Sequence, residues 1–181
     1  MKYYQIPVLR ILSLMFIIVF FSVCNNQTLQ NEKNVVDDPE MMNQKIGDQL
    51  RQQIHAAINK EGNINDSIQL SLVKAVYDYY EQNNYQNIWS NQENWLPIAD
   101  TLLLFIQQSK DYGLFPKDYH YNSLLALQQS FAADTLAAGS RRDAVQWTNA
   151  DLLLTDAFFL IASHLHKGRL GVDSVYMNPD S

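Results

Sequence analysis

Cysteine is almost absent from this sequence, since Cys24 is the only one among 181 residues. A single thiol cannot form a disulfide within the chain, so a disulfide-stabilised fold is excluded. A thiol nucleophile also needs a histidine beside it in the folded body, whereas Cys24 directly follows an N-terminal apolar run. Cysteine-dependent catalysis by this chain is therefore not expected.

Glycine is also scarce, and the six glycines never cluster. A phosphate cradle needs closely spaced glycines, so a nucleotide-binding loop is not expected. The Gly-x-Ser-x-Gly elbow of serine hydrolases is missing too, and no Ser-x-x-Lys stands near a glycine-rich loop. From these absences we predict no catalytic residue and no cofactor.

Basic residues are outnumbered, because 13 Lys and Arg face 19 Asp and Glu and the net charge is -6. Lys2 and Arg10 lie in an N-terminal segment that holds no acid, so the remainder of the chain is more acidic still. An acidic body repels a phosphate backbone, and nucleic acid is therefore excluded as an expected partner.

Residues 1–23 are typical of a signal peptide. A basic start precedes the apolar run 11–23, which is shorter than the roughly 20 residues that a transmembrane helix needs. An uncleaved membrane anchor is the alternative, because Tyr3, Tyr4 and Ile6 extend the apolar length. Both interpretations place the protein in the cell envelope, facing the periplasm and tethered to a membrane.

The residues just before the cysteine resemble a lipobox, the acylation signal of bacterial lipoproteins. Phe21, Ser22 and Val23 precede Cys24, where the lipobox pattern has an aliphatic residue first and a small residue last. The resemblance implies that Cys24 is the lipid attachment site and the first residue of the mature protein. Acyl chains contribute about 0.8 kcal/mol per buried CH₂ to membrane binding, so tethering is expected with or without cleavage.

The segment 24–42 consists mainly of Asn, Gln, Glu and Asp, with Pro39 and few large apolar residues. Such a segment cannot bury enough apolar surface to fold, and we predict a disordered tether. The tether would lead to a folded body at 43–172, which a short tail at 173–181 follows.

The body shows helical periodicity from its first residues onward. Apolar residues recur there every four positions, as on one face of an amphipathic helix. These residues are Met42, Ile46, Leu50, Ile54 and Ile58. The sequence predicts further helices at Asp66–Asn84, Asn94–Gly113, Ser123–Phe131 and Asp143–Lys167. The prediction rests on the spacing of apolar residues and on capping residues, prolines and glycines near the expected helix ends. No strand is expected, because no segment between turn signals alternates strictly between apolar and polar residues.

The last of these helices is the longest, and it is apolar on nearly every side from Leu152 onward. A helix without a polar face is usually surrounded by other helices, so we place it at the centre. Gly168 supplies its C-terminal stop. The predicted fold class is therefore all-α, an irregular bundle of about five helices around a long central C-terminal helix.

His164 and His166 form the only close histidine pair, and the functional interpretation is a metal site. Two residues apart on a helix, they point to opposite sides and cannot hold one ion as residues four apart could. A solvated helix end is favoured, and no metal is expected.

Asp151 and Asp156 stand in the apolar part of the same helix. Paired carboxylates can act as acid and base on a glycosidic bond, but residues five apart diverge by roughly 140° around a helix of about 3.6 residues per turn. For Asp156 we favour a buried structural acid. The candidate partners are Arg141, Arg142, Arg169 and a backbone N–H.

Six aromatic residues gather in one stretch of the chain, at Tyr77, Tyr79, Tyr80, Tyr85, Trp89 and Trp95. An exposed group of this kind could be a stacking platform for a glycan. Helical spacing instead favours packing in the core and at the corners of the bundle.

Short motifs follow one another along most of the body, from about residue 70 to residue 172. They are Tyr77-Asp78-Tyr79-Tyr80, Asn84-Tyr85, Ile88-Trp89, Leu102-Leu103-Leu104, Gly113 to Tyr119, Asp151 to Phe158, His164-Leu165 and Gly168-Arg169-Leu170. Their order and spacing resemble the helical scaffold domain of the large L,D-transpeptidases, which cross-link bacterial peptidoglycan.

In that family the scaffold supports a peptidoglycan-binding domain and a catalytic domain with His-x-x-Gly-Thr and Ser-x-Gly-Cys-x-Arg motifs. Neither motif occurs in this sequence. The resemblance therefore implies a non-catalytic scaffold region, whose partner is peptidoglycan or a catalytic domain. We expect either a fragment, with 173–181 at the truncation point, or a scaffold whose other domains are supplied elsewhere.

The alternative is a stand-alone helical lipoprotein that binds a protein partner or peptidoglycan in the cell envelope. The two hypotheses differ in one surface property. A scaffold without its other domains should expose an apolar patch where those domains dock, whereas a free-standing bundle should not.

Overall fold

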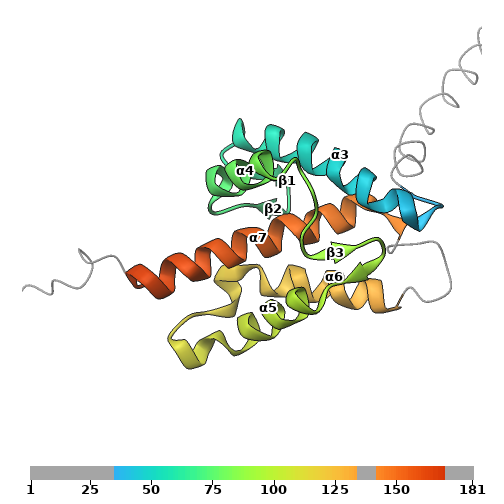
Figure 1. The fold of residues 1–181 in the computed structure, drawn as a ribbon. Helices are drawn as coiled ribbons and strands as arrows, with labels where there is room; N and C mark the ends of the chain where they lie inside the picture. Colours follow the sequence, from blue (N-terminus) through green and yellow to red (C-terminus); the bar gives the residue numbers. More distant parts are fainter. Residues whose placement is uncertain (1–34, 134–141, 170–181) are drawn as a thin grey trace, which may run out of the picture. The chain divides into compact units, whose positions relative to one another are not determined.

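The computed structural model describes residues 35–133 and 142–169, which form a mostly helical bundle with a few short strands (Figure 1). The chain divides into two units, Met1–Asn34 and Val35–Ser181, and every described residue belongs to the second. The predicted signal peptide, Cys24 and the predicted tail at 173–181 therefore lie outside the described residues.

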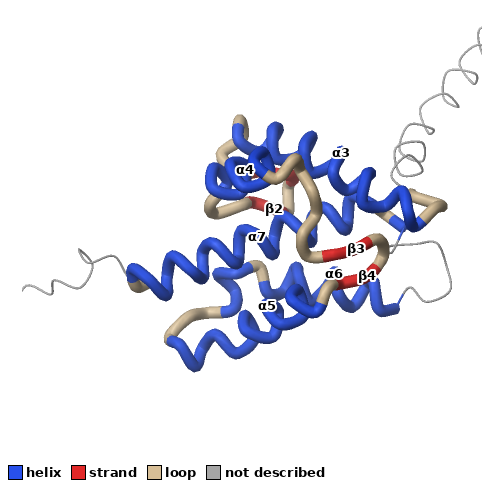
Figure 2. Tube along the Cα trace, in the orientation of Figure 1, coloured by secondary structure: helices blue, strands red, loops and turns tan. Residues whose placement is uncertain are grey.

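The elements of the folded unit are drawn by type in Figure 2. In chain order they are α3 (Pro39–Ile58), β1 (Asn63–Asn65), β2 (Ile68–Gln69), α4 (Val73–Gln82), β3 (Ser90–Asn91), β4 (Asn94–Trp95), α5 (Pro97–Gln108), the 3-10 turns η1 (Ser109–Tyr112) and η2 (Pro116–Tyr119), α6 (Tyr121–Ala133) and α7 (Ala144–Lys167). Over these described stretches, no helix is both long and apolar enough to cross a bilayer.

The bundle has three layers, with α7 in the middle (Figure 1). On one side of α7, α3 and α4 pack against each other and both contact α7. On the other side, α5 and α6 pack against each other and both contact α7 as well. Within the described residues, α7 is thus the common partner of α3, α4, α5 and α6, which agrees with the central position that the sequence predicts.

Burial along α7 explains this central position. Residues 150–157 are all buried, so this stretch has no solvent-facing side. The helix begins where the Asp143 side chain accepts a hydrogen bond from the N–H of Val145 at 2.9 Å, and it ends at Gly168, with a φ of 83°. Both predicted ends are therefore confirmed.

The four-residue periodicity of α3 corresponds to a single buried face. Met42, Ile46, Leu50 and Ile54 are each fully buried. Burying one such side chain stabilises a fold by about 1.5–3 kcal/mol, so this face provides a substantial part of the core.

The predicted tether at 24–42 is wrong over its last residues, because 35–42 belong to the folded unit. Val36 is buried, and its N–H donates to the carbonyl of Arg142 at 2.8 Å. The Asp38 side chain then caps α3, whose first residue is Pro39. A cap residue followed by proline indicates the start of a helix even in a polar segment. A prediction based only on the polar composition of the segment misses this local signal.

Two short antiparallel hairpins, β1 with β2 and β3 with β4, occur where the sequence predicts no strand. Strands this short cannot show the alternation by which strands are recognised. Asp66 and Ser67, predicted as helix caps, form the turn between β1 and β2, and α4 begins only at Val73. The backbone N–H groups at the start of α4 therefore need a hydrogen-bond acceptor from elsewhere in the chain.

Candidate functional site

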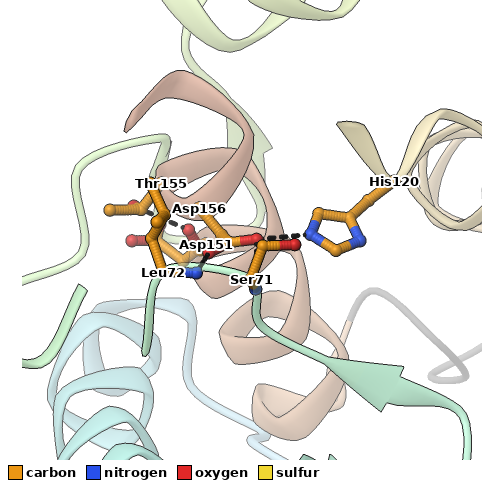
Figure 3. Close-up of polar contacts among 6 residues, drawn as sticks. All are labelled: Ser71, Leu72, His120, Asp151, Thr155 and Asp156. Atoms are coloured by element: carbon orange, nitrogen blue, oxygen red, sulfur yellow. Dashed lines mark hydrogen bonds and ion pairs between the residues drawn. The ribbon is translucent and has the colours of Figure 1, made fainter. Parts of the chain in front are cut away.

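Asp156 of α7 supplies the partner that α4 needs. Its carboxylate is fully buried and accepts hydrogen bonds from the N–H groups of Ser71 at 3.0 Å and Leu72 at 2.7 Å (Figure 3). These amides precede α4, whose N-cap residue makes no side-chain cap of its own. A carboxylate at a helix N-terminus satisfies unpaired donors and opposes the positive end of the helix dipole. Asp156 therefore acts as an N-cap contributed by another helix.

His120 completes the surroundings of this carboxylate. Its Nε2 lies 2.6 Å from Oδ2 of Asp156 (Figure 3), and the histidine side chain is largely buried. The residue follows η2 and has a φ of 58°, in the left-handed region that non-glycine residues seldom adopt. Nothing in the sequence singles out His120, because this residue has neither a motif of its own nor a neighbouring histidine.

The arginine partners predicted for this carboxylate are wrong where the structure describes them. Arg142 pairs with Asp37 at 3.2 Å, and Arg169 pairs with Asp118 at 2.7 Å. Arg141 lies outside the described residues. The remaining alternative, a backbone N–H, is confirmed.

Asp151 is the second buried acid of α7, and it binds a different part of the chain. One carboxylate oxygen accepts from the hydroxyl of Tyr80 at 2.5 Å and from the N–H of Ile88 at 3.2 Å. The other accepts from the N–H of Trp89 at 3.2 Å. The Thr155 hydroxyl extends this network, since it lies 2.7 Å from the Tyr80 hydroxyl and accepts from the Trp89 indole at 2.8 Å.

Burial dominates the acid–base properties of this network. It raises the pKa of Asp151 to about 6, although hydrogen bonds from Tyr80 and from two backbone amides favour the charged form. Burial also raises the pKa of Tyr80 well above its usual value, and the neighbouring Asp151 adds to the increase. Tyr80 therefore remains a neutral donor to the carboxylate.

The two acids do not form a catalytic pair for a sugar bond. Asp151 faces the segment that leads from α4 to β3, whereas Asp156 faces the start of α4 and the end of η2. Each carboxylate is occupied by donors from the chain itself. The divergence expected from their five-residue spacing is therefore observed, and both acids hold neighbouring segments against α7.

The histidine pair at the end of α7 is separated, as predicted. Nδ1 of His164 lies 2.8 Å from the hydroxyl of Tyr119, whereas His166 is exposed. Burial raises the pKa of the Tyr119 hydroxyl. Across residues 35–133 and 142–169, His, Cys, Asp and Glu form no group of three that could hold a metal ion.

The six aromatic residues are distributed over the core and do not form one exposed platform. Tyr80, Tyr85 and Trp89 are buried, and the other three pack against the core. Trp95, for example, contacts the ring of Trp147 with 5.9 Å between centroids. The structure thus favours the packing interpretation.

A hollow between α4, α5 and α7 is lined mainly by apolar and aromatic side chains, and we call it the apolar pocket. It has a volume of about 280 Å³ and is lined by Tyr79, Ile88, Trp89, Ile98, Thr155, Phe158 and Phe159. Ile98 is 59% exposed and Phe158 is 48% exposed. The hydroxyl of Thr155, one of the lining residues, is already paired within the buried network. Such a surface suits apolar side chains of another folded domain.

Replacing Asp156 by alanine should lower the free energy of unfolding by about 3 kcal/mol, because two amides and His120 lose a buried charged acceptor. Hydrogen exchange should also accelerate at the amides of Ser71 and Leu72, which the carboxylate covers in the wild type. Urea denaturation and exchange measured by NMR would test both effects.

Asp78→Ala is the matched control, because it removes an exposed pair with Lys74 at 2.9 Å. Exposed pairs contribute about 0–1 kcal/mol, so this variant should stay close to the wild type. Equal losses for Asp78→Ala and Asp156→Ala would contradict the capping role.

Asp151→Asn should flatten the pH dependence of stability. The folded carboxyl has a pKa of about 6 against an ordinary value of 3.8, so between these values the folded chain keeps a proton that the unfolded chain has released. The associated stabilisation, about 3 kcal/mol, is fully present below about pH 4 and is lost as the pH rises to about 6. Denaturation curves across this interval would measure the slope.

Asp111→Asn, which changes an exposed acid, should leave that slope as it is in the wild type. A wild-type slope in Asp151→Asn would show that the buried carboxyl does not titrate in this interval.

Comparison with known proteins identifies a protein family. A family model described as Scaffold domain matches residues 74–181, while no curated protein and no solved structure matches the chain. The matched region includes nearly all of α4, then α5, α6 and α7, and therefore the whole apolar pocket. It covers more than half of the chain and confirms the resemblance seen in the sequence. The chain therefore belongs to the Scaffold domain family, the scaffold domain of L,D-transpeptidases.

Proposed function

We propose that this chain is the non-catalytic scaffold region of an L,D-transpeptidase-like protein that cross-links peptidoglycan, and that a catalytic domain docks on it. The observation that carries the proposal is the family match over residues 74–181. The central helix α7 contacts α3, α4, α5 and α6, and it holds α4 through two buried carboxylates. Such rigidity suits a region that positions other domains.

The apolar pocket supports docking as the mode of action. It lies wholly inside the matched region and exposes Ile98 and Phe158 beside partly buried rings. Interface centres are enriched in aromatic side chains and depleted of charge, and no Asp, Glu, Lys or Arg lines this hollow. The apolar pocket is therefore our candidate for the exposed apolar patch that is expected where another domain docks on a scaffold.

The non-catalytic part of the proposal is supported by what the buried acids already bind. Asp151 and Asp156 are both occupied by amide, hydroxyl or imidazole groups of the chain. The sequence also lacks the His-x-x-Gly-Thr and Ser-x-Gly-Cys-x-Arg motifs of the family's catalytic domain. We infer that peptidoglycan chemistry occurs on the docked domain.

Phe158→Ser should weaken binding to the L,D-transpeptidase catalytic domain of the same cell by at least tenfold. Truncation of a central aromatic residue in an interface typically costs about 2 kcal/mol or more. Calorimetric titration of the purified chain with the separately produced catalytic domain would give the dissociation constants. Ile98→Ser should act in the same direction.

Two exposed leucines on the same helices provide controls. Leu165 of α7 is 55% exposed and Leu104 of α5 is 52% exposed, and neither lines the pocket. Leu165→Ser and Leu104→Ser should bind like the wild type. Unchanged affinity in Phe158→Ser would contradict docking at this pocket and would favour a stand-alone helical lipoprotein.

We also propose that the protein is exported and held at a membrane, with its folded unit facing the periplasm. Support comes from the sequence of residues 1–23, from the lipobox-like approach to Cys24 and from the polar segment that follows. Export brings a scaffold of this family to peptidoglycan, and the lipid keeps it beside the wall.

Mass spectrometry of the protein from bacterial membranes should find Cys24 as an acylated N-terminal residue. Cys24→Ser should then move the protein from the membrane fraction to the soluble fraction. An unmodified Cys24 behind an intact leader would contradict lipid attachment, and retention of Cys24→Ser in the membrane would favour the uncleaved anchor.

A further inference from the structure

A second hollow lies where the end of α5, the two 3-10 turns and the start of α6 meet, and we call it the lysine hollow. It has a volume of about 560 Å³, and its walls are Gln107 of α5, Lys110 of η1, residues 115–117 and residues 121–122. Binding sites typically have about 300–1,000 Å³. The lysine hollow shares no residue with the apolar pocket, so it can have a role separate from docking.

Positive charge in the lysine hollow is not neutralised by the described part of the chain. Lys110 and Lys117 line the hollow, and no Asp or Glu does. Neither lysine side chain makes an ion pair or hydrogen bond within residues 35–133 and 142–169. Of the acids next to them in sequence, Asp118 is paired with Arg169 at 2.7 Å and Asp111 does not line the hollow. In a chain of net charge -6, such a place favours an acidic occupant.

The apolar part of the lysine hollow consists of Phe115, Pro116 and Tyr121. Phe115 is 44% exposed, although the guanidinium of Arg169 lies 4.5 Å from its ring centre. Pro116 and Tyr121 are partly buried. An occupant that covers these side chains therefore needs apolar groups beside its acids.

Arg169 shows the direction in which the chain leaves the bundle. Gly168 ends α7 with a φ of 83°, and η2 packs against α7. Arg169 is the last described residue, and it both pairs with Asp118 and stacks on Phe115, a wall of the hollow. Four further residues can span about 13 Å. The residues that follow Arg169 therefore start beside the lysine hollow.

The sequence after Arg169 matches both features of the hollow. Residues 170–181 lie outside the described residues, so only their sequence enters here. They include Asp173 and Asp180 and no Lys, Arg or His. Five of them are large and apolar, namely Leu170, Val172, Val175, Tyr176 and Met177. The family match continues to residue 181, so this stretch belongs to the matched domain.

We propose that the lysine hollow binds the segment that follows it in the same chain, residues 170–181. Asp173 pairs with Lys110 or Lys117, and the neighbouring apolar side chains cover the ring of Phe115. The covalent connection through Arg169 gives the segment a high effective concentration at the hollow, so weak contacts suffice.

A bound segment gives the chain one fixed path away from α7. For a scaffold, such a path would orient the polypeptide that it positions. This consequence rests on the proposed function, whereas the contact between the segment and the hollow does not. An anionic membrane would also be attracted by lysines beside exposed aromatic rings. The segment is favoured because Arg169 already brings it to the hollow.

Carbodiimide cross-linking of the purified full chain tests the contact directly, because this reagent joins a carboxylate to a lysine amine only where the two touch. Peptide mass spectrometry should find Asp173 joined to Lys110 or Lys117. Lys45 and Lys60 are exposed lysines of another part of the bundle and serve as internal controls. Links from Asp173 to these controls should be about tenfold rarer.

Mixing ¹⁴N-labelled and ¹⁵N-labelled chains before the reaction distinguishes links within one chain from links between two. The expected links join residues of equal label. Links of mixed label would show that the segment binds a second copy and would overturn the proposal.

Asp173→Asn provides a readout at a distance from the substitution. NMR amide shifts should move at residues 115–117 and 121–122 and stay constant around the apolar pocket. Asp66→Asn, which changes an exposed acid in the turn between β1 and β2, is the matched control and should leave the hollow amides as they are in the wild type.

The proposal is overturned if Asp173 forms no link to either lysine of the hollow, or if it links equally to Lys45 and Lys60. It is also overturned if the hollow amides ignore Asp173→Asn, or if they respond only to phosphatidylglycerol vesicles, which would assign the hollow to a membrane. None of these results bears on docking at the apolar pocket, which the Phe158 variant tests separately.

Discussion

The carboxylate of Asp156 is the interaction on which the arrangement of the bundle most depends. It is fully buried on the central helix and bonds two amides at the start of α4 and the imidazole of His120 (Figure 3). Three segments that are distant in sequence therefore meet at one charge. A buried carboxylate without these donors would be strongly destabilising, so the charge and its partners require one another.

Asp151 holds the end of α4 against α7 by hydrogen bonds, as Asp156 holds its beginning. It binds the hydroxyl of Tyr80 in the last turns of α4 and the amides of Ile88 and Trp89 just beyond. The helix is thus fastened to α7 at both ends by two acids that point in different directions around the same axis. The same contacts place Ile88 and Trp89 in the wall of the apolar pocket. The acids that suggest catalysis in the sequence instead position the walls of the apolar pocket.

The helices are predictable because apolar periodicity and helix-start and helix-stop residues are local signals in the sequence. The hydrogen-bond partners of Asp151 and Asp156 are not predictable, because they lie in distant segments. Four-residue spacing on α3, Pro97 at the start of α5 and Gly168 after α7 are local signals, and each lies where the sequence places it. The spacing of the two acids also predicts that they diverge. The identity of their partners does not follow, because His120 and the amides before α4 lie in other segments and carry no pattern of their own.

The segment from 84 to 89 is fixed to the bundle in two halves. Tyr85 fixes the first half against α3, through the hydrogen bond between its hydroxyl and His55. Asp151 fixes the second half against α7, because its carboxylate accepts from the N–H groups of Ile88 and Trp89. Ile88 and Trp89 also line the apolar pocket. The wall of the pocket is therefore positioned by a buried charge on the central helix, and removing that charge should disturb the pocket as well as the stability of the fold.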